Sequence, residues 1–467
     1  MSRERLVVLG ADAGGMTAAS QARRRRPADQ LEIVAVDRGR HASYSACGIP
    51  YWIGGVLGSE EDLITRTVAE FRDKQDIEVR LRHEAVGLDL DRGEVTVRDL
   101  DAGRELRLGF DQLVLGLGAV PVRPDIPGID ATGVYGVQTL DDGEAVRAAI
   151  AGGGVRRAVV VGGGYIGLEM AEAFVLRGLE VTVVEAAPQP MSSLDPDMGA
   201  LVADAVLGLG ITLLRGEEVT GILTGPDRTV QAVATAGREI PADVVVLGLG
   251  VRPNTELPRD AGVRVGVTGG VVTDLRMRTA SHPQVWAAGD CVQSMHRVSQ
   301  APVHLPLGTH ANKQGRVAGI NLGGGYATFP GVVGTAVTKV CDLEVARTGL
   351  READADRAGL RYVSTVVQST TRAGYFPGTQ PITTKLIAEK RSGRLLGAQI
   401  VGREGAAKRI DVLATALWNE MTVEELSGLD LSYAPPFAPV WDPVLIAARK
   451  SWDAVEADVR AEHTSRP

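Results

Sequence analysis

Two glycine-rich turns constrain the fold of this chain more than any other feature of its sequence. In the more regular one, the apolar run at 158–161 leads into three glycines that open a helix-compatible segment. Because a strand that turns sharply into a helix leaves backbone N–H groups free at the helix start, such a turn can hold a pyrophosphate. A second apolar run, 181–184, ends at Glu185, where an acidic residue can bind the adenosine ribose. The predicted cofactor contacts of this dinucleotide-binding unit are Gly162, Gly164, Tyr165, Ile166, Gly167 and Glu185.

The residues around Glu185 indicate which nicotinamide cofactor binds. Its carboxylate can accept hydrogen bonds from both hydroxyls of the adenosine ribose, and its charge would repel a 2′-phosphate. No arginine follows directly, because the next residues are Ala186, Ala187 and Pro188. The sequence therefore predicts NADH over NADPH.

An earlier turn has the same pattern with one defect. It follows the apolar run at 6–9, opens a helix-compatible segment at 16–25, and is matched by a second apolar run at 31–36. The middle glycine position holds Asp12, whose side chain must turn away from a bound phosphate. The predicted cofactor contacts of this unit are Gly10, Ala13, Gly14, Gly15 and the ribose-binding Asp37.

Three later strand-like segments also end in small residues, at 110–118, 242–250 and 285–290. A strand that ends in glycine lets backbone approach a ligand closely. The third segment ends in Gly-Asp, which places a carboxylate where it can accept hydrogen bonds from sugar-like hydroxyls such as the ribityl chain of a flavin. The residues added to the predicted cofactor sites are Gly118, Gly250, Gly289 and Asp290.

Composition limits the classes of partner. The 467 residues suffice for about three domains, and the net charge of -8 argues against a nucleic-acid surface. The basic run at 23–26 is interpreted as a solvated helix end, with contact to an anionic ligand as the alternative. No signal peptide, membrane span, CxxC pair or metal-ligand spacing is recognised, and the chain has only 3 cysteines. We expect a cytoplasmic protein without a metal site.

Together these motifs resemble the pyridine nucleotide–disulfide oxidoreductase superfamily over nearly the whole chain. The resemblance implies an α/β protein with two Rossmann-like domains, in which the first fold binds FAD and the inserted second fold binds NAD(P)H. It implies an FAD-binding domain at 1–118 and 250–328, an NAD(P)H-binding domain at 119–249, and an α+β C-terminal dimerisation domain at 329–467 that forms a homodimer. A helix starting near 305–312 would point its positive end at the flavin. Its predicted FAD contacts are Leu307, Gly308 and Thr309.

Cys47 is the predicted redox residue. Glutathione-reductase-like members of the superfamily carry two cysteines here and a late His-Pro motif, whereas this chain has Trp52 at the second position and lacks that motif. Cys47 therefore has to react with a small-molecule sulfur or form a sulfenic acid. A helix that follows it would lower the pKa of its thiol. Cys291 and Cys341 are interpreted as structural.

Within the superfamily, the segments 374–378 and 432–437 resemble coenzyme A-disulfide reductases and NADH-dependent persulfide reductases. The resemblance implies that Tyr375 and Tyr433 assist the partner subunit's cysteine. It implies substrate contacts at Gln21, Arg24 and Ser43. Two positions depart from the family pattern, because an asparagine is replaced by Ala46 and a coenzyme-contacting lysine by Trp441. The thiol carrier, whether CoA or another small thiol, stays open.

The sequence thus predicts an FAD-dependent NAD(P)H oxidoreductase that reduces a low-molecular-weight disulfide or persulfide through Cys47. One alternative is an NADH oxidase or peroxidase that cycles a cysteine sulfenic acid. Such relatives place a histidine where this chain has Ala13. A non-catalytic, flavin-based NADH sensor and a reductase with a protein acceptor also stay open, because a fold alone does not fix a function.

Overall fold

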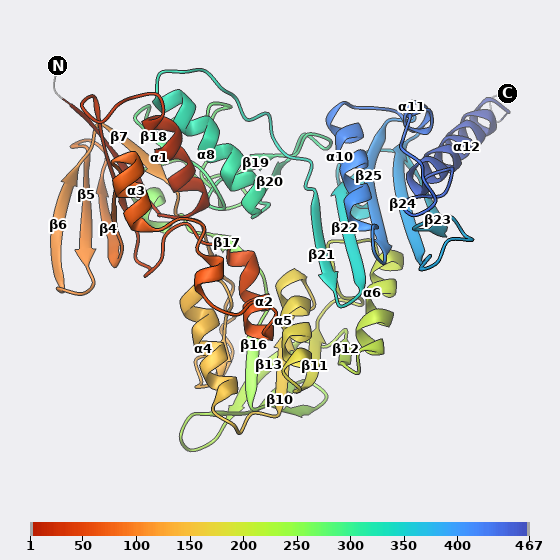
Figure 1. Ribbon diagram of the computed structural model, residues 1–467, viewed down its shortest axis with the longest axis horizontal. Coiled ribbons are helices and arrows are strands. Elements are labelled where there is room, and N and C mark those ends of the chain that lie inside the picture. The colour runs from red at the N-terminus through yellow and green to blue at the C-terminus, as the bar shows by residue number, and fades with distance from the viewer. Residues whose placement is uncertain (1–2, 465–467) are drawn as a thin grey trace.

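The computed structural model describes residues 3–464, and Figure 1 shows three lobes joined by extended connections. The first lobe is built on a parallel sheet with strand order β18-β7-β1-β2-β3. Its strands are β1 (Glu4–Leu9), β2 (Leu31–Val36), β3 (Glu78–Arg80), β7 (Gln112–Leu115) and β18 (Val285–Ala287). Helices α1 (Ala13–Arg23) and α8 (Gly308–Leu322) pack against each other beside this sheet.

Shorter elements complete the first lobe. An antiparallel sheet consists of β4 (His83–Asp89), β5 (Glu94–Asp99) and β6 (Arg104–Gly109). The helical elements are η1 (Ala46–Gly48), η2 (Glu61–Leu63), α3 (Val68–Gln75) and α7 (Glu256–Asp260). Helix α2 (Ile49–Gly54) follows η1 in the chain but packs against the second lobe. The hairpin β19 (Ser294–Met295) and β20 (Pro302–Val303) lies between β18 and α8 in the chain.

The second lobe repeats the design of the first and is inserted into it. The chain enters through β8 (Ala119–Pro121) and returns through β17 (Val251–Pro253), which pair antiparallel. The parallel sheet has order β12-β11-β10-β16-β9, made of β9 (Val134–Tyr135), β10 (Arg157–Val161), β11 (Glu180–Glu185), β12 (Thr212–Arg215) and β16 (Val244–Leu247). Its other elements are α4 (Leu140–Ala151), α5 (Tyr165–Leu176), α6 (Pro196–Gly208), β13 (Val219–Thr224), β14 (Val230–Thr235) and β15 (Glu239–Pro241).

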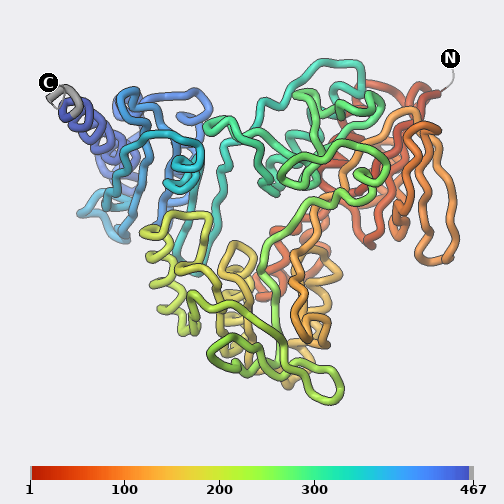
Figure 2. The backbone as a smooth tube through the Cα atoms, turned by 180° about the vertical axis from the view of Figure 1, so that it is seen from behind, coloured from red at the N-terminus to blue at the C-terminus, as the bar shows by residue number. Residues whose placement is uncertain are grey.

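The third lobe lies at the C-terminal end of the chain, coloured cyan to blue in Figure 2, and is an antiparallel sheet with helices. Its strand order is β21-β22-β25-β24-β23. The strands are β21 (Ala336–Val340), β22 (Leu343–Gly349), β23 (Tyr362–Thr370), β24 (Pro381–Glu389) and β25 (Leu395–Gly402). The helices are α9 (Glu352–Arg357), η3 (Ala407–Arg409), α10 (Ile410–Trp418), α11 (Val423–Ser427) and α12 (Pro443–Thr464). Every residue of the central strand β25 is buried.

The predicted fold class is confirmed, with two parallel-sheet nucleotide-binding folds and an antiparallel C-terminal domain. The two glycine turns lie between β1 and α1 and between β10 and α5, as the sequence predicts. The numerical domain boundaries and the cytoplasmic location stay predictions. Over residues 3–464, no helix is both long and apolar enough to span a bilayer. The same described residues contain no group of three or more side chains suited to hold a metal ion.

Candidate active site

The predicted FAD contacts converge at one edge of the first parallel sheet. Gly10 follows β1 with a φ of +105°, and a Cβ at this position would collide with the carbonyl oxygen of Gly116 beyond β7. A Cβ on Gly14 would lie 2.9 Å from the carbonyl oxygen of Ala288, just beyond β18. Three strand ends and the start of α1 thus approach so closely that only glycine fits. Gly118, Gly289 and Asp290 belong to the same strand-end segments, and Gly15 lies in the first turn of α1.

Helix α8 begins at the sites predicted from the sequence. Leu307 precedes its first turn as the N-cap residue, and Gly308 and Thr309 open the helix. The backbone N–H of Gly289 donates a 2.8 Å hydrogen bond to Oε1 of Gln314 in α8. This bond ties the helix to the loop after β18, so the α8 start faces the same edge of the sheet as the glycine turn.

The two acidic residues predicted to bind ribose hold the same position in the two folds. Asp37 accepts hydrogen bonds from the backbone N–H of Ala11 at 2.8 Å and of Gly39 at 2.7 Å. Glu185 accepts from the backbone N–H of Gly163 at 2.6 Å and of Ala187 at 2.7 Å. Each carboxylate is thus fixed beside its glycine turn, in a geometry that fits the adenosine end of a dinucleotide.

Asp12 is the one irregular residue of the first turn. Asp12 is the N-cap residue of α1, but its side chain makes no capping hydrogen bond to the helix. Burial and the neighbouring carboxylates of Asp37 and Asp290 raise its pKa from 3.8 to about 6. The turn therefore holds a carboxyl that is partly protonated near pH 6, at a position where a glycine would have no side chain.

The second turn forms the N-terminus of α5. Gly162 has a φ of +100°, and a Cβ there would lie 2.5 Å from the carbonyl oxygen of Gly248 beyond β16. Gly164 is the N-cap, and Tyr165, Ile166 and Gly167 form the first turn of the helix. The Tyr165 hydroxyl accepts a 3.3 Å hydrogen bond from Ser193. Gly250 has a φ of +81° and lies just beyond β16.

Cys47 lies between the two folds. Its side chain is exposed in the short turn η1, which leads into α2. Partial burial raises the pKa of the Cys47 thiol, and so do the carboxylates of Glu169 in α5 and Asp290 beyond β18. The expectation of a lowered pKa is wrong for this structure, because desolvation and these two carboxylates outweigh the dipole of a single-turn helix.

A small acidic cavity beside Cys47 was not predicted. It has a volume of about 90 Å³ and is lined by Pro50, Tyr51, Val56, Glu169, Glu172, Ala173, Leu176 and Lys339. Glu169 accepts a 2.8 Å hydrogen bond from Thr338 of the C-terminal domain, and burial raises the pKa of its carboxyl. Glu169 directly follows the glycine turn in sequence, but the strand that covers it comes from another lobe, so sequence spacing gave no sign of this cavity.

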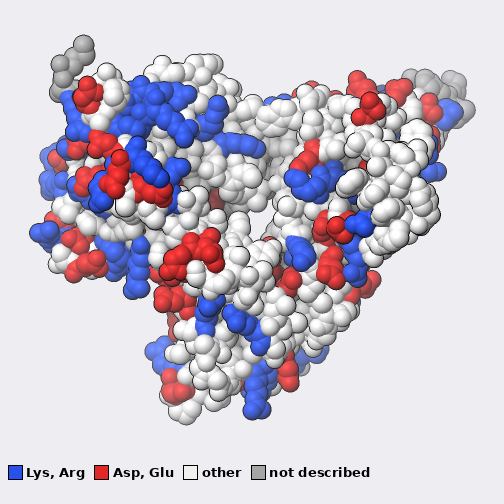
Figure 3. Space-filling model, in the orientation of Figure 1, with Lys and Arg blue, Asp and Glu red and all other residues white. Residues whose placement is uncertain are grey.

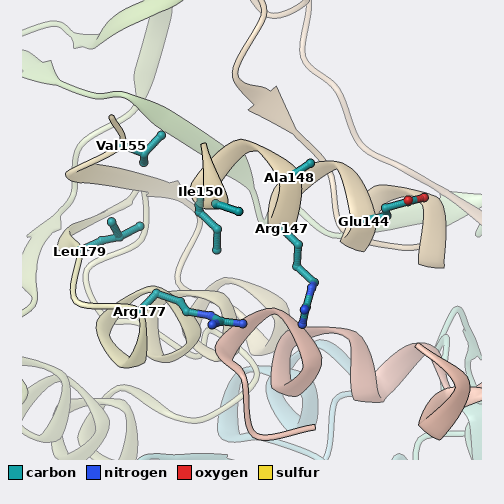
Figure 4. A pocket seen from close by; sticks show the side chains of 8 residues that line it. Glu144, Arg147, Ala148, Ile150, Val155, Arg177 and Leu179 are labelled. Atoms are coloured by element: carbon teal, nitrogen blue, oxygen red, sulfur yellow. The ribbon is translucent and has the colours of Figure 1, made fainter. Parts of the chain in front are cut away.

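Two arginines of the second fold anchor the helix that follows Cys47. Arg147 Nη1 donates a 2.6 Å hydrogen bond to the carbonyl oxygen of Trp52, and Arg177 Nε donates one of 2.6 Å to that of Ile53. The Arg147 guanidinium also lies 4.6 Å from the centre of the Trp52 ring. Figure 4 shows both side chains pointing from the wall of a cavity of about 550 Å³ toward α2. Ile49, Trp52 and Ile53 are buried in the core of the second fold, so the segment that holds Cys47 is packed against this fold.

The predicted catalytic tyrosines lie in the C-terminal domain. Tyr375 is 77% exposed and Tyr433 is 46% exposed, and the neighbouring Tyr375 raises the pKa of the Tyr433 hydroxyl. They follow β23 and α11, whereas Cys47 precedes α2 in the centre of Figure 1. A single chain therefore pairs the tyrosines with each other and leaves them apart from Cys47.

The three predicted substrate contacts lie on the first fold. Gln21 and Arg24 are at the end of α1, where Gln21 accepts a 3.0 Å hydrogen bond from Arg25 and Arg24 is exposed. Figure 3 shows a cluster of lysine and arginine side chains over this end of α1. Ser43 lies in the loop before Cys47 with a φ of +50°, and its backbone N–H donates to the carbonyl oxygen of Ala11.

Comparison with known proteins agrees with this arrangement. The model of the pyridine nucleotide-disulphide oxidoreductase family matches residues 4–315, and that of its dimerisation domain matches residues 335–443. An NAD(P)H sulfur oxidoreductase (CoA-dependent) of Pyrococcus abyssi is 37% identical over 448 residues, which are 96% of this chain and 98% of the relative. An NADH oxidase of Methanocaldococcus jannaschii is 36% identical over 445 residues, with 95% of this chain and 98% of the relative covered.

A solved structure extends the likeness to three dimensions. The NAD-dependent persulfide reductase from A. fulgidus is 39% identical, with a TM-score of 0.94 over 97% of this chain and 84% of that chain. The predicted family is therefore confirmed along both nucleotide-binding folds and the C-terminal domain. The chain belongs to the pyridine nucleotide-disulphide oxidoreductase family.

Proposed function

We propose that the protein reduces a low-molecular-weight disulfide or persulfide with electrons from NADH, which reach the substrate through FAD and Cys47. One observation carries the proposal. The exposed Cys47 lies close enough to Asp290 of the first fold and Glu169 of the second for both carboxylates to raise the pKa of its thiol. This position supports the proposal, because a sulfur between the two folds would be within reach of both nucleotides.

The residues present fit the two nucleotides. Asp37 and the start of α8 would hold FAD in the first fold, and Glu185 with the turn at 162–167 would hold NADH in the second. FAD, when bound, would supply two-electron transfer between nicotinamide and sulfur. The chain itself contributes the ribose-binding carboxylates, the helix starts that face the phosphates and the close-packed glycines.

Cys47 would perform the sulfur chemistry. Its thiolate attacks one sulfur of a disulfide RSSR, which forms Cys47–S–S–R and releases one thiolate. The electron pair that NADH supplies then breaks this second S–S bond and returns Cys47 as thiolate with release of the other thiol. The sum is NADH + H⁺ + RSSR giving NAD⁺ + 2 RSH, and a persulfide RSSH would give RSH and H₂S. No second cysteine is needed, in keeping with the burial of Cys291.

Tyr375 and Tyr433 would supply the proton for a leaving thiolate from the partner subunit of a homodimer. The match to a dimerisation domain at 335–443 supports this arrangement. So does an exposed apolar set around the tyrosine pair, which a second copy of the chain would cover. This set consists of Phe437, Val440 and Trp441.

The substrate class is proposed from the residues at the end of α1 and from the names of the relatives. The exposed Arg24 beside Gln21 suits an anionic carrier such as CoA, and the relative at 37% identity is named as CoA-dependent. The asparagine and the lysine of the family pattern are replaced by Ala46 and by the exposed Trp441, so two polar contacts that the resemblance implies are missing. We propose a small anionic thiol carrier, with CoA as the first candidate to test.

The test is anaerobic NADH oxidation by the FAD-loaded enzyme with CoA disulfide, CoA persulfide or cystine as sole acceptor. The proposal expects one NADH per disulfide and two thiols formed. A parallel aerobic assay without acceptor measures water and peroxide, because a relative of similar identity is an NADH oxidase. Faster turnover with oxygen than with every sulfur acceptor would instead support the oxidase.

A further inference from the structure

The strand next to Glu185 ends in an arginine. In the parallel pair β11–β12, Glu185 lies opposite Arg215. Residues opposite each other on neighbouring strands project from the same face of the sheet, so Arg215 emerges beside the carboxylate that faces the glycine turn. The arginine is exposed, and its Nη1 donates a 2.9 Å hydrogen bond to Oε1 of Gln189 in the loop after β11.

The first fold provides an internal comparison for this position. There β2 and β3 pair Val36 with Arg80, so Leu81 lies opposite the ribose carboxylate Asp37. The same backbone hydrogen bond follows the acidic residue in both folds. The carbonyl oxygen of Asp37 accepts from the backbone N–H of His83 at 2.8 Å, and that of Glu185 accepts from the backbone N–H of Glu217 at 3.1 Å. Leu81 and Arg215 are therefore equivalent. The fold that would bind the adenosine of FAD has a leucine, and the fold that would bind the nicotinamide nucleotide has an arginine.

The charge of Arg215 is not neutralised by the protein. Among residues 3–464, no ion pair within 4.0 Å involves its guanidinium. The acidic residue that follows β12, Glu217, is held by Arg238 at 2.9 Å. An exposed guanidinium fixed by one amide, beside the site of an adenosine ribose, has the chemistry to bind a phosphate monoester.

We propose that Arg215, oriented by Gln189, binds the 2′-phosphate of NADPH and offsets the repulsion from Glu185, so that the second fold accepts NADPH as well as NADH. The inference rests on the proposed function only in taking Glu185 as the adenosine-ribose residue. The sequence-based expectation of NADH over NADPH considered only the residues directly after Glu185. The arginine that matters comes from the neighbouring strand.

The test compares two adenosine probes, 2′,5′-ADP and 5′-AMP, titrated calorimetrically into FAD-loaded enzyme. Arg215→Leu installs the residue of the equivalent position in the first fold. Removal of one charge-assisted hydrogen bond corresponds to about tenfold weaker binding of 2′,5′-ADP, with 5′-AMP binding changed less than about twofold. Arg215→Lys should recover part of the affinity, because it restores charge without the planar fork. The value of kcat/KM for NADPH should fall in parallel, with that for NADH preserved.

Arg228→Gln serves as the matched control, because it removes one exposed positive charge from the β13–β14 turn of the same fold. Equal weakening of both probes by Arg215→Leu, no weakening of 2′,5′-ADP, or the same weakening in the control would overturn the inference. Failure of the wild-type enzyme to oxidise NADH with any acceptor would instead reject the proposed function. The probe titration still reports on Arg215 in that case.

Discussion

The anchoring of α2 by Arg147 gives the prediction that the structure specifies most fully. Helix α2 has 6 residues, too few to be stable without tertiary contacts. Arg147→Ala removes the 2.6 Å hydrogen bond to the Trp52 carbonyl and the guanidinium stacked at 4.6 Å on its ring. A charge-assisted hydrogen bond contributes about 1.5–3 kcal/mol and a cation–π contact about 0.5–1 kcal/mol. Because the two share one side chain, we expect a decrease of roughly 2–3 kcal/mol in the free energy of unfolding.

Two assays separate local from global destabilisation. Urea denaturation of the FAD-loaded protein gives the change in unfolding free energy, and the rate of Cys47 alkylation by iodoacetamide reports how firmly α2 holds the cysteine. A Cys341→Ser background leaves Cys47 as the exposed thiol, because Cys291 is buried. We expect faster alkylation at unchanged pH in Arg147→Ala. Arg177→Ala should behave similarly but more weakly, since Arg177 is exposed.

Glu144→Ala is the control for this experiment. Glu144 is an exposed residue of the same helix and lines the same cavity, and Figure 4 shows it at the end away from Arg177. A stability change in Arg147→Ala below about 0.5 kcal/mol, the usual range for surface substitutions, together with unchanged alkylation, would refute the anchoring argument.

Three further predictions concern buried or partly buried charges. Because the pKa of Asp12 is raised from 3.8 to about 6, ionisation of its carboxyl opposes folding. Between these two pH values the folded state holds a proton that the unfolded state has lost. The free energy of unfolding therefore falls as the pH rises from 3.8 to about 6. Asp12→Asn should therefore stabilise the ligand-free protein by up to roughly 3 kcal/mol above pH 6 and by nothing below pH 4, and equal melting shifts at both pH values would contradict this. The Lys385 side chain is 3% exposed and its ammonium lies 3.2 Å from the carboxylate of the buried Asp195. Lys385→Met should therefore lower the free energy of unfolding, measured by urea denaturation, by about 3–5 kcal/mol, because it leaves a buried carboxylate unpaired. A decrease under about 1 kcal/mol would show that Asp195 is solvated. Since the Glu169 carboxylate raises the pKa of Cys47, Glu169→Gln should shift the pH profile of Cys47 alkylation downward, and an unshifted profile would remove Glu169 from the account.

The parts of the fold that depend on local pattern could be predicted from sequence. The strand at Leu31–Val36 and the helix that begins at Tyr165 lie where an apolar run and a glycine turn predict them. The glycine turns were recognisable because their function requires particular residues at fixed spacing.

What depends on distant parts of the chain could not be predicted. Arg215 acts beside Glu185 only because two strands pair in one register, and Lys385 neutralises Asp195 across two domains. The pKa of Cys47 was expected in the wrong direction, because it is raised by partial burial and by Glu169 and Asp290, which come from separate folds. The segments that hold Tyr375 and Tyr433 could be recognised by their motifs, whereas the contact of these tyrosines with Cys47 stays a prediction.

The role of Cys47 is tested most directly by stopped-flow comparison of wild type with Cys47→Ser, both loaded with FAD, in separate half-reactions. The account predicts that NADH reduces the flavin in Cys47→Ser at a rate within about twofold of wild type, because the nucleotide sites are intact. Reoxidation by CoA disulfide, or by the best sulfur acceptor found, should slow by at least about a thousandfold, the scale of removing a covalent nucleophile. Cys341→Ser should retain both half-reactions. Rapid reoxidation of the reduced Cys47→Ser enzyme by the sulfur acceptor would contradict the claim that electrons leave the protein through Cys47.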